Sequence, residues 1–261
     1  MASEHLQSPL LAAAGFQHAF FTRHGGVSDG PYATLSFSLA AGAAGDRPEN
    51  VRENLERAAE RLGTSAESVH FLSQVHGREV WVLDGSESRD RTLEREGDAL
   101  VSRAPGIACG VRIADCAPVL LADRKSGAVA AAHAGWRGVA QNVVAAAVVR
   151  LREVAGADGE LIAAIGPHIS VAAFEVSDDV ARELAAASPD PDVVDRTRGP
   201  KPHVDLRKIL RAQLRALGLE DGAIDDVAGC TLSEPERFFS FRRDGKQSGR
   251  HLAAIVARPR S

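Results

Sequence analysis

Hydrophobic and polar residues alternate along the chain in short blocks that predict strands and helices in mixed order. Short apolar runs bounded by Gly, Asp or Pro are typical of buried strands. We assign strands to the runs 18–22, 69–72, 79–83, 107–113, 118–122, 128–132, 161–165, 238–241 and 252–257. Strands separated by helices of unequal length favour an α+β fold over a regular doubly wound sheet.

Apolar positions at helical spacing predict helices over 46–62, 139–156, 178–187 and 205–217. In the first of these, Asp46 is the expected N-cap, Pro48 lies in the first turn, and Gly63 ends the helix. The polar, charge-rich stretches 84–97 and 188–202 are expected to form surface loops.

The length of 261 residues fits one domain or two tightly packed lobes, and we expect a single domain over 1–261. No apolar run approaches the roughly 18 to 20 residues that a membrane span needs. The N-terminus lacks the basic start and apolar stretch of a secretion signal. We therefore expect a cytoplasmic protein that does not cross a membrane. The net charge of −4 argues against a nucleic-acid-binding protein, and the sequence indicates no particular oligomeric state.

The cysteine and histidine content restricts what kind of metal site the chain can form. Three cysteines, an odd number, argue against a disulfide framework. The nine histidines include no His-x-His and no His-x3-His pair, so no local segment provides two metal ligands at once. A metal site must combine residues from distant segments.

Three segments each end an apolar strand with a potential ligand and then turn at Gly or Pro, and they carry His76, Cys116 and His133. Two imidazoles and one thiolate suit tetrahedral Zn²⁺ with the fourth position open to water or substrate. A metal held there can supply hydroxide near neutral pH. The same residues also suit a nucleophilic pair, in which an imidazole takes the thiol proton. Each residue alone also fits a structural role, as a buried thiol or a hydrogen-bonded core histidine.

Eight short motifs occur in order along the chain. They are FFTRHGGVS at 20–28, QVHG at 74–77, DALV at 98–101, ADCAPV at 114–119, AHAGWRG at 132–138, IGP at 165–167, FEV at 174–176, and FFSFRRD at 238–244 with Gly249-Arg250. In sequence and order they resemble the bacterial YfiH family, from about residue 16 to the C-terminus. Members of this family are labelled polyphenol oxidases, laccase-domain proteins or purine nucleoside phosphorylases.

The resemblance implies an α+β fold of mixed sheets with flanking helices, similar to the catalytic domain of the cytotoxic necrotizing factor toxins. It also implies a zinc-containing purine nucleoside phosphorylase that accepts adenosine, inosine and methylthioadenosine and deaminates adenosine. The family's ligand positions match His76, Cys116 and His133. Its partners are then purine nucleosides and phosphate.

Three other functions remain open. In the related toxins a Cys and a His act in hydrolysis, so one alternative is that Cys116 and His133 are nucleophile and base of a hydrolase acting on an amide or a cell-wall precursor. A non-catalytic metal-binding module would have a closed site with four protein ligands. A His₂Cys set also occurs in blue-copper sites, but cupredoxin-type multicopper oxidases use several His-x-His pairs. We therefore favour zinc over copper.

Phosphorolysis requires cationic donors for phosphate, and four arginines in or beside the motif turns are the candidates. They are Arg23, Arg137, Arg242 and Arg243. Proton transfer to the departing purine or from the attacking group is assigned to zinc-bound water, His24 or Asp115. Asp115 has a second interpretation, which we favour, as the carboxylate that orients a ligand histidine.

The sequence also predicts the surroundings or the role of four further residues. Gln74 is expected to orient the purine base or to cap a turn. His168 stands where many family members carry Cys, and we expect an exposed loop histidine there. Cys109 and Cys230 are expected to be buried small hydrophobes.

Overall fold

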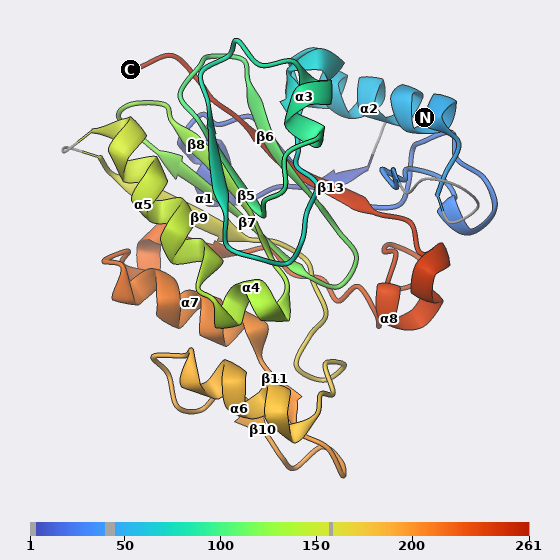
Figure 1. Cartoon of the computed structure of the whole chain (residues 1–261), viewed down its shortest axis with the longest axis vertical. Helices are drawn as coiled ribbons and strands as arrows, with labels where there is room; N and C mark the ends of the chain where they lie inside the picture. The colour runs from blue at the N-terminus through green and yellow to red at the C-terminus, as the bar shows by residue number, and fades with distance from the viewer. Residues whose placement is uncertain (1–3, 40–44, 157–158, 261) are drawn as a thin grey trace.

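Two mixed β-sheets lie face to face in this chain, with helices on their outer faces (Figure 1). The computed structural model describes residues 4–39, 45–156 and 159–260. Within these residues, no helix is both long enough and apolar enough to cross a bilayer.

The larger sheet has six strands in the part of the chain that the structure describes, in the order β12-β9-β7-β8-β5-β4. The strands are β4 (Val80–Leu83), β5 (Ala99–Ser102), β7 (Ala117–Asp123), β8 (Val129–Ala134), β9 (Leu161–Ile165) and β12 (Ile224–Asp226). Strand β12 runs parallel to β9 and β4 runs parallel to β5, whereas the other neighbours are antiparallel. Ala99 of β5 pairs with Ala132 of β8. Asp98, just before β5, therefore lies beside His133 on the neighbouring strand.

The second sheet has five strands among the described residues, in the order β1-β2-β13-β6-β3. They are β1 (His5–Leu6), β2 (His18–Phe21), β3 (Val69–His70), β6 (Ala108–Ile113) and β13 (His251–Val256). Only the pairing of β3 with β6 is parallel. Strands β10 (Val194–Asp195) and β11 (His203–Val204) form a separate two-stranded sheet. The mixture of strand directions confirms the predicted α+β class. The comparison with the necrotizing factor fold stays a prediction.

Helices lie between the strands in the sequence. They are α1 (Pro9–Ala13), α2 (Pro48–Leu62), α3 (Arg89–Leu93), α4 (Trp136–Ala140), α5 (Val143–Ala155), α6 (Asp178–Ala186), α7 (Leu206–Ala216) and α8 (Phe241–Asp244). Single 3₁₀ turns are formed by Gly30–Tyr32, Ala66–Ser68, Asp221–Ala223 and Gly245–Gln247. Helices α6 and α7 and strands β10 and β11 occupy the lower part of Figure 1.

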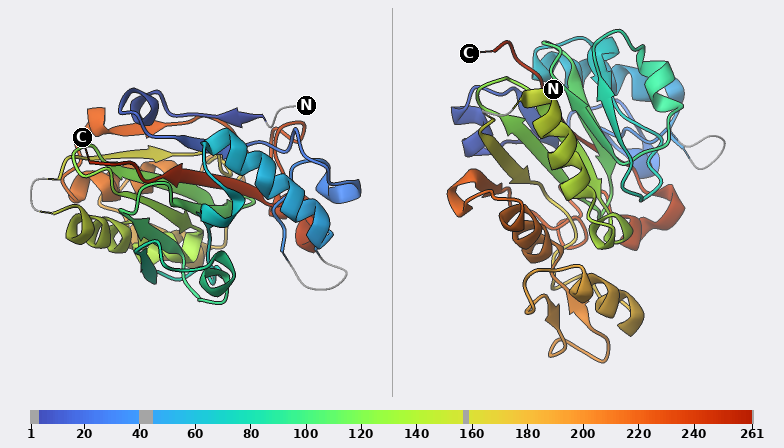
Figure 2. Two further views of the ribbon diagram at one scale, coloured as in Figure 1. Left: turned by 90° about the horizontal axis from the view of Figure 1, so that it is seen from above. Right: turned by 60° about the vertical axis from the view of Figure 1, so that its left-hand side comes forward.

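Buried apolar side chains form three clusters, each of which fills the space between two layers. One cluster joins α5 and α7 to the outer face of the six-stranded sheet. A second fills the space between the two sheets, with Leu120 of β7 and Ile255 of β13 as members. A third joins α2 to the outer face of the five-stranded sheet, with Leu55 and Leu252. The order helix, sheet, sheet, helix can be followed in the two views of Figure 2, and this shared interior supports the single domain that we propose for the chain.

Most predicted elements are confirmed to within two residues. The confirmed strands lie at 18–22, 79–83, 107–113, 118–122, 128–132, 161–165 and 252–257, and the confirmed helices at 46–62, 178–187 and 205–217. The strand predicted at 69–72 ends at His70. The loop predicted at 188–202 contains the two residues of β10.

The predicted N-cap of α2 was wrong by one residue. Arg47 precedes the helix in an extended conformation, because a proline at the next position disfavours helical geometry in the residue before it. The Asp46 carboxylate instead accepts hydrogen bonds from Arg47 N at 2.8 Å and from Asn50 Nδ2 at 3.2 Å. Gly63 ends the helix with φ of +67°, as predicted.

The helix predicted over 139–156 is two helices, α4 and α5. Asn142 separates them with a left-handed φ of +60°, a conformation that Asn tolerates better than most residues. Its side-chain oxygen accepts a hydrogen bond from Ala145 N at 3.3 Å and so begins a new helix. The apolar spacing continues across this break, which is why the pattern predicted one helix.

Two other predictions were wrong for the same reason, a serine N-cap. The predicted loop 84–97 contains α3, which begins after Ser88, whose hydroxyl accepts from Arg91 N at 3.4 Å. The predicted strand 238–241 is not a strand, because Ser240 caps α8 by accepting from Arg243 N at 3.2 Å.

Candidate metal centre

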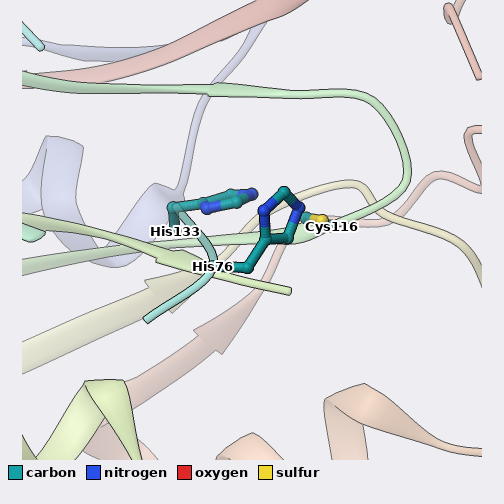
Figure 3. Close-up of side chains that lie close together, drawn as sticks. All are labelled: His76, Cys116 and His133. Carbon is teal, nitrogen blue, oxygen red and sulfur yellow. The ribbon is translucent and has the colours of Figure 1, made fainter. Parts of the chain in front are cut away.

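Three side chains from distant segments meet at one end of the sheets (Figure 3). His76 lies in the loop between β3 and β4, Cys116 in the turn between β6 and β7, and His133 near the end of β8. One nitrogen of each histidine and the cysteine sulfur lie within 4.8 Å of one another, and the three side chains point toward one another. Two nitrogens and one sulfur at this spacing match the donor set of a tetrahedral zinc site with one open position.

Asp98 holds the ring of His133. The carboxylate Oδ1 lies 2.7 Å from His133 Nδ1, and the backbone carbonyl of Asp98 accepts from His133 N at 2.7 Å. Asp98 is fully buried, at the residue just before β5. With Nδ1 engaged, Nε2 is the nitrogen of His133 left to bind a metal.

The same carboxylate holds the loop of His76. Three successive backbone N–H groups, from Val75, His76 and Gly77, donate to Asp98 at 3.3, 2.9 and 2.6 Å. His76 has a left-handed φ of +61°, which bends the loop around the carboxylate. The Gln74 side chain ties the loop to the other sheet, because it donates to Arg112 O and accepts from Arg112 N, both at 2.8 Å.

The turn that carries Cys116 is fixed through the residue before it. Asp115 has φ of +83°, and its carboxylate accepts from Thr231 Oγ1 at 2.6 Å, Ser240 Oγ at 3.1 Å and Arg242 N at 2.6 Å. Asp115 therefore joins the cysteine turn to the C-terminal segment. The prediction that Asp115 orients a ligand histidine was wrong, because Asp98 makes that contact.

Gly135 has no side chain, and this leaves room for the side chains of His76 and Cys116. A Cβ atom at this position would lie 2.8 Å from His76 Cδ2 and 3.0 Å from Cys116 Sγ. The φ of Gly135 is −69°, so the requirement for glycine comes from this close approach and not from the backbone conformation.

The electrostatics of the cluster favour a thiolate. Burial alone would raise the pKa of Cys116, but the charge of His133 and hydrogen bonds from His133 and His76 lower it. Burial opposes the protonation of His133, but the charge of Cys116 and the hydrogen bond to Asp98 raise its pKa. The thiolate is the form of cysteine that binds metals and acts as a nucleophile.

The cluster opens into a cleft of about 730 Å³, a size typical of small-molecule sites. Part of the lining is apolar and comes from α4, α7 and the loop after β9. Another part is cationic. The apolar lining includes Trp136, Ile169, Phe174 and Leu206, and the cationic lining consists of Arg112, Arg137, Arg242 and Arg250.

The other predicted substrate residues divide into two groups. Arg137, Arg242 and Gln74 line the cleft. Arg23 and Arg243 do not: Arg23 donates to Ala33 O at 3.0 Å and Pro235 O at 2.9 Å, and Arg243 donates to Phe238 O and the Asp244 carboxylate, each at 2.9 Å. Both guanidinium groups are therefore used to hold loops together.

His24 is exposed and lies outside the residues that line the cleft. The expectation of an exposed His168 was wrong, because this residue is 2% exposed and its Nδ1 lies 2.7 Å from Gly166 O. Its burial, with the charge of Arg207, lowers its pKa to about 4. Cys109 and Cys230 are buried, as predicted.

Sequence reasoning missed the roles of Asp98, Arg112 and Arg250. Each had a visible signal. Asp98 directly precedes an apolar run, and Arg112 is the one charge inside the run 107–113. Arg250 lies in the last of the eight motifs, but the sequence predicted no role for it. A charged residue at or within an apolar strand needs a partner, and this requirement was the signal.

Comparison with known proteins places the chain among well-defined relatives. Residues 17–258 match a family described as multi-copper polyphenol oxidoreductase laccase. A Streptomyces griseus protein named purine nucleoside phosphorylase ORF3 is 39% identical over 256 residues, which cover 98% of this chain and 99% of that protein. The Escherichia coli K12 protein named purine nucleoside phosphorylase YfiH is 36% identical over 234 residues, 90% of each chain.

Solved structures agree with the fold. YlmD from Geobacillus stearothermophilus superposes with a TM-score of 0.87 at 31% identity, covering 98% of this chain and 99% of its own. A Bacillus licheniformis hypothetical protein, YfiH, gives a TM-score of 0.84 at 26% identity, covering 93% and 92%.

Proposed function

This chain belongs to the YfiH family, described as multi-copper polyphenol oxidoreductase laccase, and from this membership we propose that it is a purine nucleoside phosphorylase. The observation that carries the proposal is the cleft itself, in which a potential metal site, an apolar wall and arginines share one cavity. The names of the curated relatives support the same activity.

The proposed reaction joins a phosphate oxygen to C1′ of the ribose and breaks the bond between C1′ and N9 of the purine. The substrates that we propose are adenosine, inosine and methylthioadenosine, and the products are the free base and a ribose 1-phosphate. The purine leaves with the bonding electrons and must be neutralised by a proton or a cation. The apolar lining formed by Trp136, Phe174 and Leu206 suits the flat base.

We propose Zn²⁺ as the metal and His76, Cys116 and His133 as its ligands. Their donor set fits zinc, and Gly135 provides the room that the group needs. When bound, zinc supplies Lewis-acid polarisation of substrate and activation of water, which also suits the proposed deamination of adenosine. Asp98 keeps the His133 ring in the orientation that exposes Nε2.

The remaining residues of the cleft have positioning roles in this proposal. Arg137 and Arg242, which the sequence suggested for phosphate, are exposed at the cleft, and we propose that they contact the nucleoside instead. The Gln74 side chain is occupied by the backbone of Arg112, so we assign it to holding the His76 loop. Asp115 holds the Cys116 turn in place through Thr231.

A copper-dependent polyphenol oxidase is the less favoured alternative. Multicopper catalysis needs several copper centres. Within residues 4–39, 45–156 and 159–260, the single group of three or more suitable side chains is His76, Cys116 and His133. The phosphorylase proposal requires one such centre only.

A Cys-His hydrolase is the second candidate, and the lowered pKa of Cys116 beside His133 favours it. In that mechanism Cys116 attacks the acyl carbon of an amide or cell-wall precursor, and His133 takes the thiol proton and passes it to the amine that leaves as the C–N bond breaks. Water then hydrolyses the thioester and frees Cys116. The hydrolase needs no metal and forms a covalent acyl-enzyme, which separates it experimentally from the phosphorylase.

One experiment decides between these functions. Protein purified without added metal is analysed for metal content and assayed with adenosine in the presence and absence of phosphate. We expect near-stoichiometric zinc and phosphate-dependent release of adenine, both lost in Cys116→Ser and both kept in Cys230→Ser, since Cys230 lies outside the cleft. Inosine formed without phosphate reports the deaminase activity. Metal-free protein that is active and acylated at Cys116 would establish the hydrolase instead.

A further inference from the structure

Arg112 and Arg250 are neighbours on one face of the five-stranded sheet. Arg112 of β6 pairs with Leu252 of β13, so Arg250, two residues before Leu252, is its diagonal neighbour on the same side. This face ends at the cleft, which both arginines line together with Cys116 and His133.

Neither guanidinium has an acidic partner among the residues that the structure describes. Arg112 donates from Nη2 to Leu72 O at 3.3 Å and stacks 5.0 Å from the centre of the Phe71 ring, while its buried Nε has no partner. Arg250 donates from Nη1 to Ser248 O at 2.8 Å and Gly249 O at 3.0 Å. These contacts leave donors of both groups unused.

Two partly buried cations side by side are unfavourable without a counter-ion. Burial lowers the pKa of Arg112 to about 10, and the charge of Arg250 acts in the same direction. Burial also lowers the pKa of Arg250, whereas the charges of Cys116 and Asp115 oppose this effect. Arg250 therefore lies within electrostatic reach of both Arg112 and the potential metal ligand.

From this arrangement we infer that Arg112 and Arg250 form the binding site for inorganic phosphate, which is an extension of the proposed phosphorylase function. Guanidinium groups bind phosphate oxygens through paired hydrogen bonds. Arg112 Nη1 and Arg250 Nη2 donate to no other group among the described residues, and they suit the oxygens of one phosphate dianion. The anion also cancels the repulsion between the two cations.

Each part of the cleft then has its own role in the reaction. Phosphate held at the arginine pair attacks C1′, the C1′–N9 bond breaks with its electrons going to the purine, and the proton of hydrogen phosphate ends on the base. The apolar wall at Trp136 and Phe174 is left for the purine. Arg112 and Arg250 thus act on phosphate, and Arg137 and Arg242 on the nucleoside.

Calorimetric titration of inorganic phosphate into the full-length protein tests the inference. In Arg112→Met an unbranched apolar side chain keeps packing on Phe71 and removes the charge. Loss of a charged hydrogen-bonding partner is expected to weaken phosphate binding by roughly 10- to 100-fold. Arg250→Lys keeps the charge but loses the planar fork, and we expect a smaller loss. The KM for phosphate should rise in parallel, and the KM for the nucleoside should stay within about twofold of the wild-type value.

Arg95→Met is the matched control. Arg95 also stacks on an aromatic ring, 4.5 Å from the centre of Trp81, but it lies outside the cleft lining. Its phosphate affinity is expected to equal that of the wild type. Thermal unfolding supplies a second measurement. In phosphate-free buffer Arg112→Met should be no less stable than the wild type, because a repulsion has been removed. Phosphate should raise the melting temperatures of the wild type and of Arg95→Met alike, and that of Arg112→Met by less.

The outcomes separate the inference from the proposed function. Phosphorolysis in the wild type with an unchanged phosphate affinity in Arg112→Met and Arg250→Lys would overturn the arginine pair and leave the phosphorylase intact. Phosphate binding that depends on both arginines, in a protein without phosphorolysis, would support the pair and reject the phosphorylase. A titration with adenosine 5′-monophosphate separates the two sources of phosphate: if only this nucleotide loses affinity in the variants, the site for free phosphate is overturned.

Discussion

The Asp98 carboxylate and the His133 imidazole form a buried pair, with Oδ1 and Nδ1 2.7 Å apart. The same carboxylate accepts backbone hydrogen bonds from the loop of His76. A single side chain therefore fixes the positions of two of the three potential metal ligands.

Asp98→Asn is predicted to weaken zinc binding by roughly 10- to 100-fold, the usual cost of losing a carboxylate that supports a ligand histidine. In the variant, the N–H groups that now share the carboxylate would face either the NH₂ group of the amide or its uncharged oxygen. Zinc affinity measured by competition with a chelator checks this. Asp123→Asn is the control, since Asp123 is also fully buried and accepts from Ser126 N at 2.6 Å but lies outside the cleft. Equal losses of zinc affinity in both variants would contradict the role of Asp98.

Gly135→Ala is predicted to reduce zinc affinity by on the order of 10- to 100-fold, because misplacing reactive or binding groups by a fraction of an ångström to 1 Å has costs of this size. The new methyl group would contact His76 and Cys116, while the backbone conformation suits alanine. The fold should survive, with about 1–3 kcal/mol of overpacking cost. Gly199→Ala, whose Cβ would meet nothing within 4 Å, should bind zinc as the wild type does. Full zinc affinity in Gly135→Ala would show that the ligands can move aside.

Asn142→Ala is predicted to lower the free energy of unfolding by about 1–2 kcal/mol, because it removes the N-cap of α5 and leaves a left-handed residue without a favourable side chain. Asn142→Gly loses the cap but accepts the positive φ, so it should lose less. Urea denaturation of the two variants measures the difference. An alanine variant as stable as the glycine variant would mean that the backbone at this position changes with the substitution.

Stability is predicted to fall as the pH drops from about 6.5 toward 4, in part through His168. Its folded-state pKa of about 4 lies below the ordinary histidine value of 6.5, so the unfolded chain takes up the proton first. The stabilisation is complete above pH 6.5 and is lost as the pH falls through the folded-state value, by about 3 kcal/mol in total. His168→Asn, whose amide can still donate to Gly166 O, should flatten this pH dependence. Substitution of the exposed His24 by Asn should leave it unchanged, and an equal slope in His168→Asn would contradict the assignment.

The strands and helices were largely predictable because burial sets a period of two or of 3.6 in the sequence. The errors occurred where one side chain overrides that period: Asn142 interrupts a continuous apolar stripe, and Ser240 begins a helix inside an apolar run. Caps of this kind act through one or two hydrogen bonds, which hydrophobic periodicity does not register.

Their places at strand ends made His76, Cys116 and His133 candidates, and the resemblance joined them into one ligand set, since they are far apart in sequence. Which acidic residue supports them was not predictable. Asp98 and Asp115 are both acidic residues beside apolar strands, and which of them faces His133 depends on the pairing of β5 with β8. That pairing is a property of the sheet as a whole. The acidic partner of a ligand becomes assignable only after the register is known.

The division of the ligands along the chain has a practical consequence. The exposed residues 84–86 separate His76 from the segment that carries Asp98, Cys116 and His133. A chain cut at this point yields one fragment with a single ligand and another with two ligands and their supporting carboxylate. Zinc binding by the mixed fragments would then show that they have reassembled. The metal centre can therefore be used to detect complementation between the two halves of the molecule.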